Sequence, residues 1–84
     1  MSKCVYLLYD VSNIVRYVGQ GTLKRSKDRN NARSQEYRDI LKDGGYIKVI
    51  EDGLSKDSAI EIERRLITEY FDGKYPDWDL LNKV

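Results

Sequence analysis

Glu63 is a carboxylate inside what reads as the apolar stripe of a helix. The nearest positions on the same helical face hold core-forming residues: Ala59, Leu66, Ile67 and Tyr70. The other charged residues of this segment fall on the sides or back of the helix: Glu61, Arg64, Arg65 and Glu69. A carboxylate drawn toward a core needs a cation, a metal ion or several hydrogen-bond donors, because an unpaired buried charge is very costly. Glu63 is therefore a candidate functional residue; the other interpretation is a glutamate at the stripe's edge that turns out to solvent.

A basic stretch in the first half of the chain suits phosphate chemistry. Between residues 16 and 42, eight basic residues stand against three acidic ones, so this stretch carries a net charge of +5 and the rest of the chain −4. The basic residues are Arg16, Lys24, Arg25, Lys27, Arg29, Arg33, Arg38 and Lys42. Such a stretch favours a nucleic-acid backbone, with Lys24, Lys27 and Arg33 as candidate DNA-binding residues. An ordinary solvated helix face is the alternative.

Composition excludes several other kinds of site. The chain has 84 residues, one cysteine and no histidine, so it has no internal disulfide, no Cys/His zinc site and no histidine acid–base chemistry. Any metal ion must then be one that prefers oxygen ligands. The longest apolar run, residues 5–9, is far too short for a signal sequence or a membrane span. We expect a cytoplasmic protein with no membrane partner, and the length predicts one domain over residues 1–84.

The local patterns predict a small α+β fold of order ββααβα, with a three-stranded antiparallel sheet flanked by helices. A β-hairpin followed by Gly19, Gly21 and Thr22 leads into the helical part, and Gly44-Gly45 ends it. Ser55 is the expected N-cap of the last helix. The expected elements are strands over 5–10 and 14–20, helices over 24–32 and 34–42, a strand over 46–51, a helix to residue 71, and a short helical turn within 76–84 that returns Leu80 and Leu81 to the core.

Each strand of the predicted hairpin carries a tyrosine, and the length of the loop decides whether the two rings lie on the same face of the sheet. Directly opposed residues of an antiparallel pair share a face, so a two- or four-residue loop would put Tyr6 and Tyr17 on one side of the sheet. An odd loop or a bulge would separate them, and the turn sequence does not exclude this. Tyrosine is also a common strand residue, so packing alone is the alternative role for each.

Together these residues resemble the GIY-YIG nuclease domain over essentially the whole chain. The similarity lies in Cys4-Val5-Tyr6, in Tyr17-Val18-Gly19, in Arg25 after the glycine-rich turn, in Glu63 followed three residues later by Leu66-Ile67, and in Leu81-Asn82. The chain departs from the family pattern at Cys4, Val5 and Val18, which are mild strand substitutions. Arg29 stands where many members have a histidine, which shifts the search for a general base toward the tyrosines.

The resemblance implies metal-dependent hydrolysis of DNA phosphodiester bonds. It implies Glu63 as the ligand of one Mg²⁺ or Mn²⁺ ion per site, and Arg25 as the phosphate clamp, a role that Lys27 or Arg29 could also fill. It favours Tyr6 as the base and Tyr17 as the residue that orients water or phosphate. A free phenol has a pKa of about 10, so a base of this kind needs a nearby positive charge. Gly19 and Asn82 are implied to be structural. Asn82 would tie the C-terminal turn to the site or the core, and the alternative is that it caps a helix end.

Other functions remain open from the sequence. The basic stretch could serve a non-catalytic nucleic-acid-binding module, with Glu63 paired to an arginine, or the chain could be an interaction domain without nucleic-acid affinity. As a nuclease it would be bacterial or phage-encoded. It would rely on a targeting domain or partner protein absent from this chain, or on oligomers for double-strand cleavage, because one active site cuts one strand.

Overall fold

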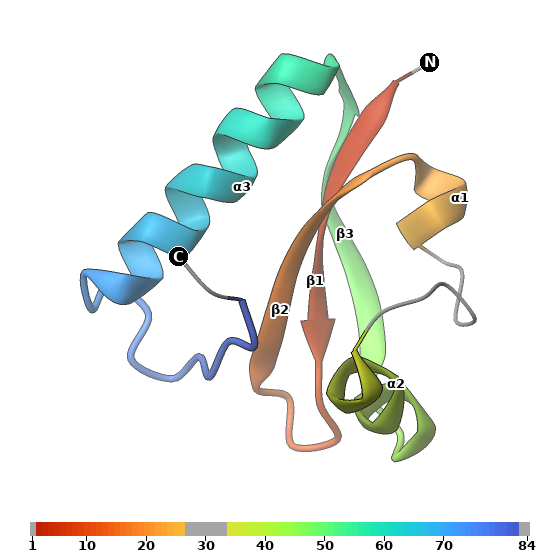
Figure 1. Cartoon of the computed structure of the whole chain (residues 1–84), viewed down its shortest axis with the longest axis vertical. Helices are drawn as coiled ribbons and strands as arrows, with labels where there is room; N and C mark the ends of the chain where they lie inside the picture. The colour runs from red at the N-terminus through yellow and green to blue at the C-terminus, as the bar shows by residue number, and fades with distance from the viewer. Residues whose placement is uncertain (1, 27–33, 83–84) are drawn as a thin grey trace.

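An antiparallel three-stranded sheet forms the centre of the structure (Figure 1). The computed structural model describes residues 2–26 and 34–82. Strand β1 (Lys3–Tyr9) lies between β2 (Val15–Gly21) and β3 (Tyr46–Leu54), which are therefore the two edge strands. This confirms the predicted α+β class and the hairpin. The third strand extends three residues beyond the predicted end at residue 51. It includes Asp52 and Gly53, and these residue types are uncommon in strands, so composition alone does not predict the extension.

The helices flank this sheet on both sides. They are α1 (Leu23–Ser26), α2 (Gln35–Lys42) and α3 (Lys56–Phe71), which gives the order ββααβα. Ser34 and Ser55 are the N-caps of α2 and α3, and each side chain accepts a hydrogen bond from a backbone N–H three residues later. Only the first residues of the helix predicted over 24–32 lie within the described part, where they form one turn. Figure 1 shows α3 on one side of the strands and α1 and α2 on the other.

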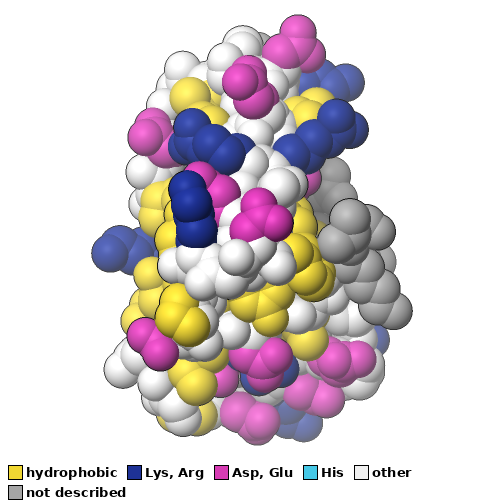
Figure 2. All heavy atoms as spheres, turned by 90° about the vertical axis from the view of Figure 1, so that its left-hand side faces the viewer, with side chains coloured by type: hydrophobic (Ala, Val, Ile, Leu, Met, Phe, Trp, Pro, Cys, Tyr) yellow, Lys and Arg dark blue, Asp and Glu magenta, His cyan; other side chains and the backbone are white. Residues whose placement is uncertain are grey.

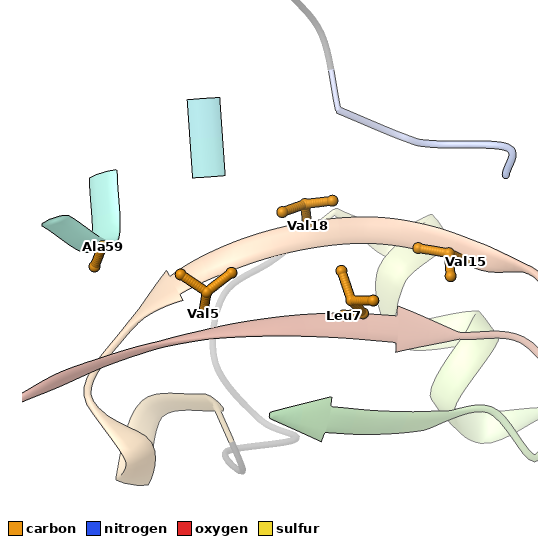
Figure 3. Close-up of a cluster of buried hydrophobic side chains, with 5 residues drawn as sticks. All are labelled: Val5, Leu7, Val15, Val18 and Ala59. Carbon is orange, nitrogen blue, oxygen red and sulfur yellow. The ribbon is translucent and has the colours of Figure 1, made fainter. Parts of the chain in front are cut away.

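The hydrophobic core is divided between the two faces of the sheet because side chains alternate along β1. Figure 3 shows the cluster on the α3 side, which joins Val5 and Leu7 of β1 to residues of β2 and α3; its members are Val5, Leu7, Val15, Val18 and Ala59. The cluster on the other face contains Leu8 of β1 and three residues of α2, namely Tyr37, Ile40 and Leu41. The sheet is therefore held between α3 and α2.

The segment after α3 returns to the sheet, as predicted, but mostly in an extended form. A turn closes where Trp78 N–H donates to Tyr75 O at 3.0 Å, and the chain then runs beside β2. Leu80 packs against the cluster on the α3 side and Leu81 against the cluster on the α2 side. The predicted short helix is wrong for the described residues 76–82, which contain one hydrogen-bonded turn and no helix, because the rest of the segment bonds to a strand edge. None of the helices within residues 2–26 and 34–82 has the length and hydrophobicity of a membrane-spanning segment.

Candidate functional site

Tyr6 and Tyr17 lie on the same face of the sheet. In the register of β1 and β2, Tyr6 pairs with Gly19 and Leu8 pairs with Tyr17, so the two tyrosines are diagonal neighbours. The loop between Tyr9 and Val15 has five residues, an odd number that alone would put the tyrosines on opposite faces. A bulge next to Leu8 adds one unpaired residue of β2 and restores the shared face. The two tyrosines therefore share a face, one of the two arrangements that the sequence leaves open, and they do so through an odd loop and a bulge together.

Gly19 is the cross-strand partner that makes room for the Tyr6 ring. A Cβ built on Gly19 would come within 2.6 Å of the Tyr6 hydroxyl oxygen, a distance that real Cβ contacts do not show. Tyr6 is 0% exposed, and Gly19 is also buried. The Tyr6 phenol is therefore enclosed at the strand pair, with its hydroxyl shut off from solvent.

Tyr17 differs from Tyr6 in being half-buried, and its ring is held by a residue of α2. The rings of Tyr17 and Tyr37 meet edge to face, with centroids 5.2 Å apart and an interplanar angle of 88°. Tyr37 is 3% exposed and belongs to the core cluster on this face. Of the two motif tyrosines, Tyr17 is the one that a solvent molecule can reach, and Tyr37 fixes the direction of its ring.

Asn82 forms hydrogen bonds to the outer edge of β2 through the oxygen and the nitrogen of its side-chain amide. Val18 N–H donates to Asn82 Oδ1 at 2.8 Å, and Asn82 Nδ2 donates to Val18 O at 2.9 Å. The amide therefore takes the place of a neighbouring strand at Val18, between Tyr17 and Gly19. This agrees with a role in tying the C-terminal segment to the site, and the alternative of a helix-end cap is wrong.

Glu63 is half-buried on the stripe of α3 that faces the sheet. Ala59, one turn earlier, is fully buried in the cluster that contains Val18, and Leu66 and Ile67, one turn later, pack against the same cluster. Glu61 and Arg64 beside it are exposed. The expected core neighbours of Glu63 are therefore confirmed, whereas its role as a functional residue stays a prediction.

The candidate residues lie on two sides of the edge strand β2. Tyr17 packs with the cluster on the α2 face, whereas the stripe of α3 that holds Glu63 packs on the opposite face. Asn82 sits on the edge between them. The tyrosine side and the stripe that holds Glu63 therefore flank β2, whose outer edge is bonded to Asn82 at Val18.

Glu63 is the residue that the family resemblance implies as a metal ligand. Within the described part of the chain, no group of three or more Asp, Glu, Cys or His side chains is arranged to hold an ion. Carboxylate oxygens are ligands that Mg²⁺ prefers, so Glu63 could contribute to holding such an ion, and this stays a prediction.

The basic stretch is only partly visible in the structure. Lys24 is exposed in α1, which begins two residues after β2 ends, and Arg25 follows it in the same turn. The expected phosphate and DNA ligands Lys27, Arg29 and Arg33 lie outside the described residues. Figure 2, which faces α3, shows basic and acidic side chains mixed over that helix. The face formed by α3 is therefore not a purely basic patch.

One basic residue of that stretch, Arg16, is engaged within the protein. Its Nη1 lies 3.5 Å from Asp10 Oδ2, and its Nε donates to Asp79 O at 2.7 Å. The sequence does not indicate this role, because Asp10 and Asp79 both lie outside the basic stretch of residues 16–42. Tyr37 is buried, as the repeat of Ile40 and Leu41 on its helical face indicates.

A polar cluster closes the C-terminal end of α3. Tyr75 Oη donates to Glu69 Oε1 at 2.8 Å, and Lys74 Nζ lies 3.2 Å from Glu69 Oε2. The hydrogen bond from Tyr75, followed by that from Lys74, lowers the pKa of Glu69. The same bond from Tyr75 to Glu69 raises the pKa of the Tyr75 phenol. The Tyr75 ring stacks on Trp78 with centroids 4.0 Å apart, so this cluster anchors the start of the C-terminal segment.

No family model matches this chain, and neither a curated protein nor a solved structure matches it. The resemblance to GIY-YIG nucleases therefore rests on the motif residues of the sequence alone.

Proposed function

We propose that this chain is a metal-dependent endonuclease that hydrolyses DNA phosphodiester bonds. The observation that carries the proposal is the register of the hairpin, which puts Tyr6, Tyr17 and Gly19 at adjacent positions on one face. These are the tyrosines and the glycine of the motif. Asn82 bonded to Val18 and Glu63 half-buried on α3 supply two further positions of the same motif around one strand edge.

The exposure of the two tyrosines supports a particular division of their roles. Tyr17 is half-buried whereas Tyr6 is fully buried, so we assign the role of general base to Tyr17. Tyr6 is fully buried against Gly19 and would support the strand pair on which Tyr17 stands. This reverses the preference for Tyr6 as base that the family resemblance favours.

The charged residues would act on the phosphate. Glu63 would hold a Mg²⁺ or Mn²⁺ ion, which when bound polarises the phosphate and offsets the charge on the leaving oxygen. Arg25 could offer two parallel N–H donors to the non-bridging oxygens as negative charge builds up there. Lys24, exposed beside it, would contribute to binding of the DNA backbone.

The test is conversion of supercoiled plasmid DNA to the nicked form in Mg²⁺, with EDTA as the metal-free control. Glu63→Gln removes the ligand charge at nearly constant size, and Glu61→Gln is the matched control on the exposed side of the same helix. We expect Glu63→Gln to lower the nicking rate by about a hundredfold or more, with Glu61→Gln unchanged. DNA affinity measured in EDTA should be the same for both variants.

The opposite outcomes are equally clear. Equal nicking rates for Glu63→Gln and Glu61→Gln would remove Glu63 from the mechanism. Salt-sensitive DNA binding without any metal-dependent nicking would replace the nuclease by a non-catalytic binding module. Absence of both cleavage and binding would contradict both proposals for this chain.

A further inference from the structure

The C-terminal segment 79–82 lies along the outer edge of β2 in the manner of a fourth strand. Asp79 N–H donates to Val15 O at 2.9 Å, and Leu81 N–H donates to Arg16 O at 2.6 Å. The Asn82 amide continues the row of bonds to Val18. The segment therefore runs in the same direction as β2 and follows it from Val15 to Val18.

Arg16 is the residue of β2 that the bulge leaves without a partner on β1. Leu8 pairs with Tyr17 and Tyr9 pairs with Val15, so Arg16 is passed over between them. A slip of one residue in a strand sends every side chain to the other face. Without this bulge, Tyr17 would turn away from Tyr6 and toward the face that α3 covers.

The Arg16 side chain fastens the bulge to both the hairpin loop and the C-terminal segment. Its Nε donates to Asp79 O at 2.7 Å and lies 3.8 Å from Asp79 Oδ2, while Nη1 lies 3.5 Å from Asp10 Oδ2. Asp10 is itself fixed, because its Oδ1 accepts from Ser12 N–H at 2.9 Å and Ile14 N–H at 3.0 Å. One guanidinium thus joins three parts of the chain at the position that decides the register.

We propose that Arg16 is a positioning residue for Tyr17, and that it acts by locking the bulge under the C-terminal segment. The effect on cleavage rests on the proposed function; the effect on register does not. A planar guanidinium is required, since a lysine carries one terminal ammonium and no donor at the Nε position. Arg16 would then contribute nothing to phosphate binding, despite its place in the basic stretch.

The experiment compares Arg16→Lys and Arg16→Ala with Lys24→Ala. Hydrogen exchange of the Asp79 and Leu81 amides reports on the C-terminal segment, and the nuclear Overhauser contact between the Tyr17 and Tyr37 rings reports on the register. Plasmid nicking gives kcat and KM. Lys24→Ala is the contrasting variant, because it removes an exposed cation of the basic stretch without touching the bulge.

We expect both Arg16 variants to exchange the two amides about tenfold faster or more, as loss of a hydrogen bond from a charged donor implies. The ring contact should weaken, and kcat should fall by about tenfold or more at unchanged KM, because the reacting group is misplaced. Lys24→Ala should instead raise KM and reduce the salt dependence of DNA binding by about one unit of slope, with amide exchange unchanged.

Three results would overturn the proposal. The first is an Arg16→Lys variant with unchanged amide exchange at Asp79 and Leu81 and an unchanged contact between the Tyr17 and Tyr37 rings. This variant tests the proposal even if Arg16→Ala does not fold. The second is a raised KM with a smaller salt slope for both Arg16 variants, which would make Arg16 a phosphate ligand. The third is faster exchange without any change in kcat. If the wild-type protein does not nick DNA, the proposed function fails, and exchange with the ring contact still tests whether Arg16 positions Tyr17.

Discussion

The Tyr6 ring lies directly over Gly19, so that a Cβ at Gly19 would come within 2.6 Å of the Tyr6 hydroxyl oxygen. Residue 19 is therefore limited to glycine by contact with a side chain on the next strand. Both residues are buried at the point where the strand pair carries the candidate site.

Gly19→Ala should destabilise the protein by about 1–3 kcal/mol, because the added methyl group overpacks the buried Tyr6 ring. Urea denaturation of the variant measures this loss. The control is a double-mutant cycle with Tyr6→Val, a change that removes the ring. If the steric explanation holds, the two substitutions will be coupled rather than additive. Additive losses would show that Tyr6 is not the reason for glycine.

Tyr17→Phe should lower the nicking rate by about a hundredfold to ten-thousandfold, the usual contribution of a general base. Tyr6→Phe should have a smaller effect on nicking, because the Tyr6 hydroxyl is buried. Tyr46→Phe is the matched control, since its hydroxyl bonds to Asn13 in the hairpin loop and its ring stacks on Tyr9 instead of contacting the motif tyrosines. Strong loss in Tyr6→Phe together with an active Tyr17→Phe would reverse the assignment.

Asn82→Ala should cost about 1–3 kcal/mol of unfolding free energy, because it leaves the N–H and C=O of the buried Val18 without their present partner. Asn82→Asp should also destabilise, since it keeps an acceptor for Val18 N–H but sets an oxygen against Val18 O. Urea denaturation compares the two variants with the wild type. Wild-type stability in both would mean that the amide does not hold the β2 edge.

The Glu69–Tyr75 pair should make stability depend on pH at both ends of the range. The lowered pKa of Glu69 contributes stability above its ordinary value of 4.5, and this contribution is lost as the pH falls through the lowered pKa. The raised pKa of Tyr75 contributes stability below its ordinary value of 10.0, and this is lost as the pH rises through the raised pKa.

Thermal unfolding of Tyr75→Phe across pH tests this linkage. The difference in Tm from the wild type should be largest near neutral pH and should shrink toward both extremes. Tyr70→Phe, on α3 beside Glu69, is the control. A difference that stays constant with pH would mean that the hydrogen bond between Tyr75 and Glu69 does not persist in solution.

Much of the fold follows from local signals in the sequence. Ser55 predicts the start of α3, and the apolar spacing around Glu63 predicts which face of the helix meets the sheet. The hairpin follows from two strand-like runs around the loop that contains Asn13, which adopts a φ of 64°. These features depend on residues close together in the chain, so one sequence is enough to predict them.

The C-terminal part of the candidate site could not be predicted in the same way. Asn82 bonds to a residue 64 positions earlier, and the bonds of Asp79 and Leu81 use only backbone groups that every residue type has. The tyrosine pairing was open for a related reason: the loop and the bulge at Arg16 compensate each other, and the bulge depends on partners at positions 10 and 79.

The segment along β2 also has a consequence for solubility during purification. Removal of residues 79–82 would uncover Val15 O, Arg16 O and both backbone groups of Val18 on an edge strand. Exposed edges of this kind pair readily with other chains and promote aggregation. A shortened version of the protein for crystallisation or NMR should therefore keep the chain through Asn82. Removal of residues 79–82 would leave the edge of β2 exposed and prone to pair with another molecule.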